Sequence, residues 1–108
     1  MDDSSLPPLS RKEALILGLL LESSSREMYG LELVAASRGG LARGTVYVTL
    51  SRMLDKGFVT ARPESPPPGK GGLPRQLYRV TGFGQRAYEA REELARAHLA
   101  ESWACSPG

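Results

Sequence analysis

The sequence is poor in the residues that build disulfides, metal centres and nucleophilic active sites. Its 108 residues include one cysteine, Cys105, and one histidine, His98. A single cysteine excludes an intramolecular disulfide and a cysteine-rich metal site, and a single histidine leaves no two-histidine ligand set. We therefore expect no metal and no cofactor. An enzyme is disfavoured as well, because the sequence shows neither a phosphate-binding loop nor paired carboxylates beside a base.

Long apolar runs are also lacking. The longest spans residues 14–21 and is interrupted by Gly18, whereas a helix needs about 20 apolar residues to cross a bilayer. The first residues are Met1, Asp2 and Asp3, which are acidic where a signal peptide is basic. These features predict a cytoplasmic protein without a membrane partner, and the length fits a single domain.

The charges are nearly balanced in number but unevenly distributed. The net charge is +2, yet residues 38–91 hold ten basic and three acidic side chains. Residues 1–37 hold three basic and six acidic side chains, and residues 92–108 hold one basic and three acidic. A basic middle between acidic ends indicates a polyanionic partner for the middle of the chain.

Hydrophobic periodicity predicts three helices in the first half of the sequence. Ser10 and Glu13 have capping-box spacing before an apolar helix over residues 11–22. A second helix is expected over 28–37, before Gly39 and Gly40, and a third over 42–56, before Gly57. The side chains expected to be buried are Leu31, Leu33, Val34 and Ala35 in the second helix, and Val46, Leu50, Met53 and Leu54 in the third.

The second half predicts a hairpin and one long helix. Two-residue alternation over 58–62 and 76–80 indicates strands, and the five prolines and three glycines of residues 63–74 indicate a loop. Thr81 is expected to cap a helix over 82–102. Three helices followed by a hairpin form a winged helix-turn-helix. We expect a flexible arm at 1–9, this domain at 10–81, a dimerisation helix at 82–103 and a tail at 104–108.

The third helix is the expected nucleic-acid contact. In a helix-turn-helix, the second helix of the pair enters the major groove of DNA. Guanidinium, hydroxyl and aliphatic groups on its outward face suit phosphates and base edges. The outward residues are Arg43, Gly44, Thr45, Tyr47, Val48, Ser51 and Arg52. The alternative is a solvated helix face that carries two arginines by chance.

The hairpin adds basic residues to this surface. Arg62, Lys70, Arg75 and Arg79 lie on its strands and loop, where they would contribute phosphate contacts and therefore salt-dependent affinity. Two alternatives stay open. Lys70 can belong to a loop without a partner, and Arg79 can pair with Asp55 or Glu64.

The last helix carries two apolar stripes. We expect the first, made of Phe83, Ala87, Ala90, Leu94 and Ala97, to pack on its own domain. The second would then be uncovered, which favours pairing with the same helix of another copy. Its members are Tyr88, Ala95, Leu99 and Trp103. The alternative is a helix that covers the core of a monomer.

Four segments of the sequence resemble the PadR family of bacterial transcriptional regulators. They are ILGLLLE (16–22), MYGLEL (28–33), LARGTVYVTLSRMLDKGFVTAR (41–62) and LPRQLYRVTGFGQRA (73–87). The resemblance implies a homodimeric winged-helix repressor that binds a palindromic operator and dimerises through its C-terminal helix. It also implies DNA contacts at Tyr29, Thr45, Tyr47 and Arg52, and a tight start of the second helix at Gly30.

Some features stay outside the resemblance. Many relatives have proline or alanine where this sequence has Val48, and the loop at 63–74 is longer and richer in proline than theirs. Some relatives bind a small aromatic effector, for which Trp103 is a candidate contact, although packing in a dimer also explains it. Cys105 is interpreted as an exposed bystander and His98 as a solvated or interface residue.

Two functions from different classes therefore compete. The first is a sequence-specific DNA-binding transcriptional regulator. The second is a winged-helix module that binds protein and not DNA, for which an acidic or apolar third helix would be expected.

Overall fold

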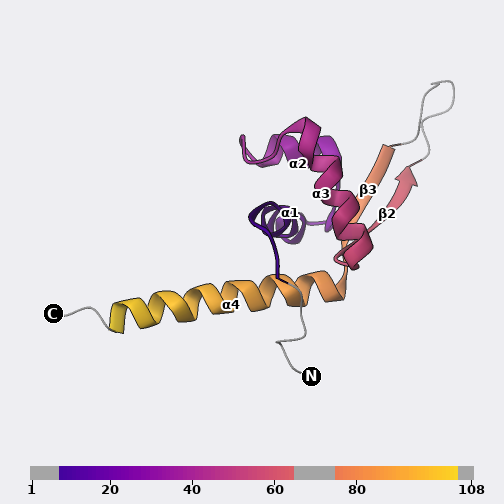
Figure 1. Ribbon diagram of the computed structural model, residues 1–108. Helices are drawn as coiled ribbons and strands as arrows, with labels where there is room; N and C mark the ends of the chain where they lie inside the picture. The colour runs from indigo at the N-terminus through magenta and orange to yellow at the C-terminus, as the bar shows by residue number, and fades with distance from the viewer. Residues whose placement is uncertain (1–7, 65–74, 105–108) are drawn as a thin grey trace, which may run out of the picture.

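The computed structural model describes residues 8–64 and 75–104, with side chains as far as residue 97. Figure 1 shows the shorter helices and a small sheet above the long helix α4 (Gly82–Ala104), which runs beneath them. The predicted mainly helical class with a hairpin is confirmed. The elements are α1 (Arg11–Glu22), β1 (Glu27–Tyr29), α2 (Gly30–Ala36), α3 (Arg43–Lys56), β2 (Val59–Glu64), β3 (Arg75–Val80) and α4 (Gly82–Ala104).

Helix α1 begins and ends at the residues predicted for it. The Ser10 side chain accepts a hydrogen bond from the backbone N–H of Glu13 (3.1 Å), and the Glu13 carboxylate accepts one from the N–H of Ser10 (2.9 Å). This reciprocal pair satisfies two N–H groups that have no partner within the helix. Ile16, Leu17 and Leu20 are completely buried, so α1 forms the centre of the core.

The Glu13 carboxylate also ties α1 to α3. Its second oxygen accepts a hydrogen bond from the Lys56 ammonium at 2.9 Å, and the residue is only 3% exposed. Burial works against ionisation, but the Ser10 N–H and the Lys56 charge outweigh it and lower the pKa of Glu13. The carboxylate is therefore held ionised inside the fold.

The prediction of one helix over residues 28–37 is wrong at its start. Residues Glu27–Tyr29 form a strand, and α2 begins at Gly30. Met28 pairs with Tyr78 of β3, while the Glu32 carboxylate accepts the N–H of Tyr29 at 2.8 Å and closes the first turn of α2. A three-residue strand is too short to reveal a two-residue alternation, which is why the sequence pattern missed it.

The buried faces of α2 and α3 are narrower than predicted. In α2, Leu33 is buried and Val34 half-buried, but Leu31 and Ala35 are exposed. In α3, which starts one residue later than predicted, the expected residues are completely buried except Leu54, which is 38% exposed. Some apolar residues of both helices, such as Leu31 and Leu54, are therefore left on the surface of the protein.

The sheet has three antiparallel strands in the order β1-β3-β2, and not the two that were predicted. The central strand β3 pairs with β2 in a register that joins Val59 to Val80, and both strands extend beyond their predicted bounds. Val59, Tyr78 and Val80 belong to the core cluster. Because side chains alternate across a strand, Leu77 and Arg79 lie on the opposite face.

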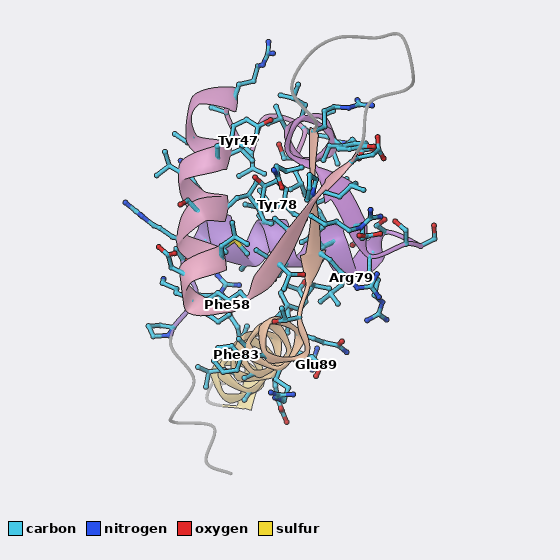
Figure 2. All side chains as sticks on the ribbon, turned by 90° about the vertical axis from the view of Figure 1, so that its right-hand side faces the viewer. Tyr47, Phe58, Tyr78, Arg79, Phe83 and Glu89 are labelled. Atoms are coloured by element: carbon cyan, nitrogen blue, oxygen red, sulfur yellow. The ribbon has the colours of Figure 1, made fainter. Side chains whose placement is uncertain are left out.

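A junction of close contacts joins the end of α3, the start of β2 and the start of α4. The rings of Phe58 and Phe83 stack with centroids 5.5 Å apart (Figure 2). The hydroxyl of Thr81 lies 2.6 Å from the carbonyl oxygen of Gly57 and accepts the N–H of Gly84 at 2.9 Å, so the predicted cap is confirmed. A Cβ atom at Gly84 would collide with the Phe58 carbonyl group. Gly57 has a positive φ of 82°, as its predicted role requires.

Helix α4 packs on the domain only with its first turns. Ala87 is buried, but Leu94 is 72% exposed and Ala97 is also exposed, so the prediction that these last two residues pack on their own domain is wrong. Tyr88, which was expected to stay uncovered, instead packs on the core, and its hydroxyl lies over Gly18 of α1. The side of α4 that packs on the domain therefore contains residues of both predicted stripes, and so does its exposed side.

Within residues 8–64 and 75–104, no helix combines the length and the apolar character that a membrane crossing requires.

The Gly84 contact predicts opposite effects for two glycine-to-alanine changes. Gly84→Ala pushes a methyl group into the backbone of Phe58 and should lower the free energy of unfolding by about 1–3 kcal/mol. Gly44→Ala is the control, because nothing lies within 4 Å of its Cβ position, and it should raise stability by up to about 1 kcal/mol. Urea unfolding of both variants measures the difference. Equal stability of Gly84→Ala and wild type would contradict the steric argument.

The lowered pKa of Glu13 predicts a stability change in acid. The Glu13 contribution is complete above the ordinary pKa of 4.5 and is lost as the pH falls through the lower pKa of the folded state. Glu13→Gln keeps an acceptor for Ser10 but carries no charge, so its stability should change less between pH 5 and acid, and at pH 7 it should be lower by roughly 1–3 kcal/mol. Thermal unfolding across this range tests the prediction, and parallel pH profiles for the two proteins would refute it.

Candidate nucleic-acid interface

The outward face of α3 has the composition that the sequence predicted. All seven of its candidate residues are exposed, while Val46, Leu50 and Met53 of the same helix are completely buried. The Thr45 hydroxyl donates to the carbonyl of Ala42 at 3.2 Å and keeps its lone pairs free to accept. The exposed residues are Arg43, Gly44, Thr45, Tyr47, Val48, Ser51 and Arg52.

The ring of Tyr47 lies in the space left by a glycine of the preceding helix. A Cβ atom added to Gly30 would lie 2.5 Å from Cε1 and 2.8 Å from the hydroxyl oxygen of Tyr47. Only glycine therefore lets the ring lie against the start of α2, in agreement with the tight start expected there. Tyr47 is still 47% exposed, so part of its side chain remains available for contacts.

A cavity of about 320 Å³ opens beside this ring. Its volume is near the lower limit for small-molecule binding sites, and its mainly apolar walls are typical of such sites. It lies where the start of α2, the second turn of α3 and the start of β3 meet. The residues around it are Tyr29, Gly30, Leu31, Glu32, Tyr47, Arg75 and Gln76.

Arg75 brings a positive charge to the edge of this cavity. Its guanidinium lies over the ring of Tyr29, 4.3 Å from the centroid, and 3.8 Å from the Glu64 carboxylate. Glu64 in turn raises the pKa of the Tyr29 phenol. The Arg75 side chain is 70% exposed, and such a long, exposed ion pair is weak, so the guanidinium can exchange Glu64 for another anion.

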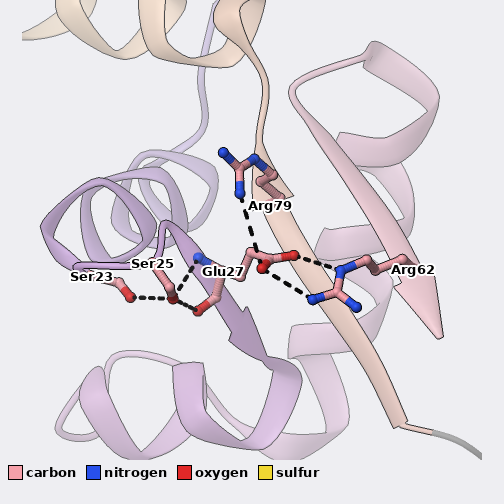
Figure 3. A network of polar contacts seen from close by, with 5 residues as sticks. All are labelled: Ser23, Ser25, Glu27, Arg62 and Arg79. Atoms are coloured by element: carbon pink, nitrogen blue, oxygen red, sulfur yellow. Dashed lines mark hydrogen bonds and ion pairs between the residues drawn. The ribbon is translucent and has the colours of Figure 1, made fainter. Parts of the chain in front are cut away.

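The remaining described arginines of the hairpin are engaged within the protein. Glu27 of β1 binds both of them (Figure 3): Arg62 at 2.9 and 3.2 Å in a forked contact, and Arg79 at 4.0 Å. The hydrogen bonds and charge of Arg62 lower the pKa of Glu27. Arg79 therefore pairs with Glu27. The sequence had suggested Asp55 or Glu64 as its partner, and that suggestion is wrong. Lys70 lies outside the described residues.

The sequence pattern did not identify Glu27 as an acidic partner, suggested Glu64 only for Arg79, and missed one wall of the cavity. Glu27 and Glu64 reach the arginines only through the pairing of β1 with β3 and of β3 with β2. Leu31 was expected in the core, yet it is 46% exposed and lines the cavity.

The residues predicted for dimerisation are only partly described. Tyr88 is half-buried against α1, and Ala95 is exposed. Leu99 and Trp103 belong to α4, but the structure does not describe their side chains. The same holds for the side chains of His98 and Cys105. A second cavity, of about 230 Å³, lies between α1 and α4 and is lined in part by Leu15, Gly18 and Tyr88.

Among the side chains described, no group of three histidine, cysteine, aspartate or glutamate residues is arranged to hold a metal ion.

The sequence and the fold are both similar to those of known transcriptional regulators. The model of the transcriptional regulator PadR-like family matches residues 16–90. A PadR family transcription regulator from hypervirulent Clostridium difficile R20291 has a similar structure, with a TM-score of 0.69 and 23% identity over 84% of this chain and 93% of that chain. None of the curated protein sequences matches the chain significantly.

Two further crystal structures have the same fold. A PadR family regulator from Eggerthella lenta DSM 2243 has a TM-score of 0.62 and 24% identity, over 87% of this chain and 82% of its own. Bacillus subtilis PadR, in complex with operator DNA, has a TM-score of 0.66 and 19% identity, over 88% of this chain and 61% of its own. These likenesses show that the fold is a PadR winged helix.

Proposed function

Because the chain belongs to the PadR-like family of transcriptional regulators, we propose that it is a homodimeric repressor that binds a palindromic operator through the outward face of α3. The exposed row of polar and basic residues on α3 carries this proposal. A protein-binding module without DNA contacts is less favoured, because Arg43 and Arg52 give this face a positive charge.

Three guanidinium groups provide the proposed DNA contacts. Arg43 lies in the first turn of α3 and Arg52 in the third, and both are exposed. Arginine binds the major-groove edge of guanine with two hydrogen bonds and also pairs with phosphates. Arg75 lies near Tyr47 at the edge of the cavity, where a phosphate of the DNA backbone would replace Glu64.

The far part of α4 supports the proposed dimer. Leu94 is 72% exposed, and α4 continues beyond the rest of the described fold to Ala104 (Figure 1). Pairing of two identical helices would cover such a residue with a closed two-fold interface. A two-fold dimer presents two copies of α3, and this symmetry requires a palindromic operator.

The domain division and the effector belong to the same proposal. Residues 10–81 are the DNA-binding domain and residues 82–103 the dimerisation helix, acting in the cytoplasm. A small aromatic effector would bind in the cavity between α1 and α4, where the Tyr88 ring, which lies over Gly18, would be one of its contacts. An occupant there would alter the packing of α4 on α1 and with it the spacing of the two α3 helices.

Replacing Arg43 and Arg52 by alanine should sharply reduce preference for the operator. Each base-specific arginine contributes about 1–3 kcal/mol to discrimination, so the double variant should lose about 2–6 kcal/mol of the difference in affinity between the operator and unrelated DNA. Gel shifts with an operator selected from random DNA measure this. Transcription in vitro from a promoter that overlaps the operator should fall with wild type and not with the variant.

Arg86→Ala is the matched control, because Arg86 is exposed on the first turns of α4, which meet the end of α3 and not the start of α3 that carries the proposed contacts. It should bind and repress as wild type does. Unchanged operator preference in the double variant would contradict the assignment of α3, and an increase in transcription with wild type would contradict a repressor.

Leu94→Glu should separate the protomers without unfolding them. The side chain is 72% exposed, so a charge there costs the monomer little but would be buried in a dimer. Sedimentation equilibrium should show a dimer for wild type and a monomer for the variant. Leu54→Glu, an exposed position on α3, is the control and should remain a dimer. A dimeric Leu94→Glu variant would contradict pairing through this face.

A further inference from the structure

Val48 has an apolar side chain that does not contribute to the packed core of the monomer. It is 53% exposed and absent from the core cluster, although α3 is anchored by Val46, Leu50 and Met53. A β-branched residue is also a weaker helix former than alanine, by a few tenths of a kcal/mol. Neither packing nor helix propensity therefore explains valine at this position.

The surroundings of Val48 make its two methyl groups prominent. Gly44 precedes it by four residues, which places it one turn earlier on the same face of α3. Nothing lies within 4 Å of a Cβ atom at Gly44, so the surface in front of Val48 is low and open. Side chains on a helix lean toward its N-terminus, and the Val48 methyl groups therefore stand over this gap.

The other neighbours of Val48 on the helix surface are polar. Ser51 and Arg52 follow it by three and four residues, and both are exposed. Tyr47 precedes it directly, but its ring is turned toward Gly30 and the cavity. Val48 is therefore a small apolar point within a face of hydrogen-bonding groups.

We propose that Val48 is a specificity-determining residue that packs against the C5-methyl group of a thymine in the operator. This inference rests on the proposed function, in which the outward face of α3 enters the major groove. The thymine methyl group is the apolar feature that a base edge presents there. Valine can neither donate nor accept a hydrogen bond, so apolar contact is the one means by which Val48 can distinguish bases.

The test removes the methyl group from the DNA and the side chain from the protein. An operator selected with the full chain is resynthesised with each thymidine replaced, one at a time, by deoxyuridine. Affinity of wild type should fall about fourfold at one position of each half-site, the effect expected for losing one buried carbon. Val48→Ala should bind the thymine operator about as weakly and should lose nothing more at that position.

Leu54→Ala is the matched control, because Leu54 is also a partly exposed apolar residue of α3, but it lies about 120° around the helix from Val48. It should show the same response to deoxyuridine as wild type. Because Val48 is exposed and alanine is the better helix former, Val48→Ala should unfold at the same or a slightly higher urea concentration than wild type, which separates loss of contact from loss of fold.

The outcomes distinguish this inference from the proposal on which it rests. If no thymine position affects wild type, or if Val48→Ala responds to deoxyuridine as wild type does, Val48 does not read a thymine methyl group. If selection from random DNA yields no preferred sequence at all, the proposed operator binding itself fails.

Discussion

The contact between the Phe58 backbone and Gly84 determines how the two halves of the molecule are placed. It leaves no room for a side chain at position 84 of α4, and the Thr81 hydroxyl lies within hydrogen-bonding distance of the carbonyl oxygens of Gly57 and Phe58. The end of α3, the start of the hairpin and the start of α4 are therefore fixed at one point. Because helices are stiff, fixing this point sets the direction of the α3 face and of α4 together.

This arrangement gives the proposed functions separate surfaces. The start of α3, the Tyr47 ring and Arg75 lie at one end of the fold, and α4 runs along the other (Figures 1 and 2). A contact that moves α4 on α1 would be transmitted through the same junction to α3. The proposed effector cavity lies beside Gly18 and Tyr88, between these two helices.

The basic middle of the sequence is less basic on the folded surface than the residue counts indicate. Glu27 lies in the acidic first third of the sequence, but β1 pairs with β3 and brings it to Arg62 and Arg79. Glu27 therefore offsets part of the positive charge that Arg62 and Arg79 would otherwise offer to DNA, whereas Arg43 and Arg52 on α3 have no such partner in the described part of the chain. A pairing remote in sequence thus narrows the surface that can bind a polyanion.

The sequence by itself determined α1, the outward face of α3, the cap at Thr81 and the order of the main elements. These features depend on periodicity and capping, which act between residues three or four positions apart. The tertiary structure alone decided that Glu27–Tyr29 is a strand, that Arg79 meets Glu27, that Leu31 lines a cavity, and that Tyr88 rather than Leu94 packs on the domain. Each of these depends on a partner tens of residues away, whose position is set only when the core closes, and no local pattern records it.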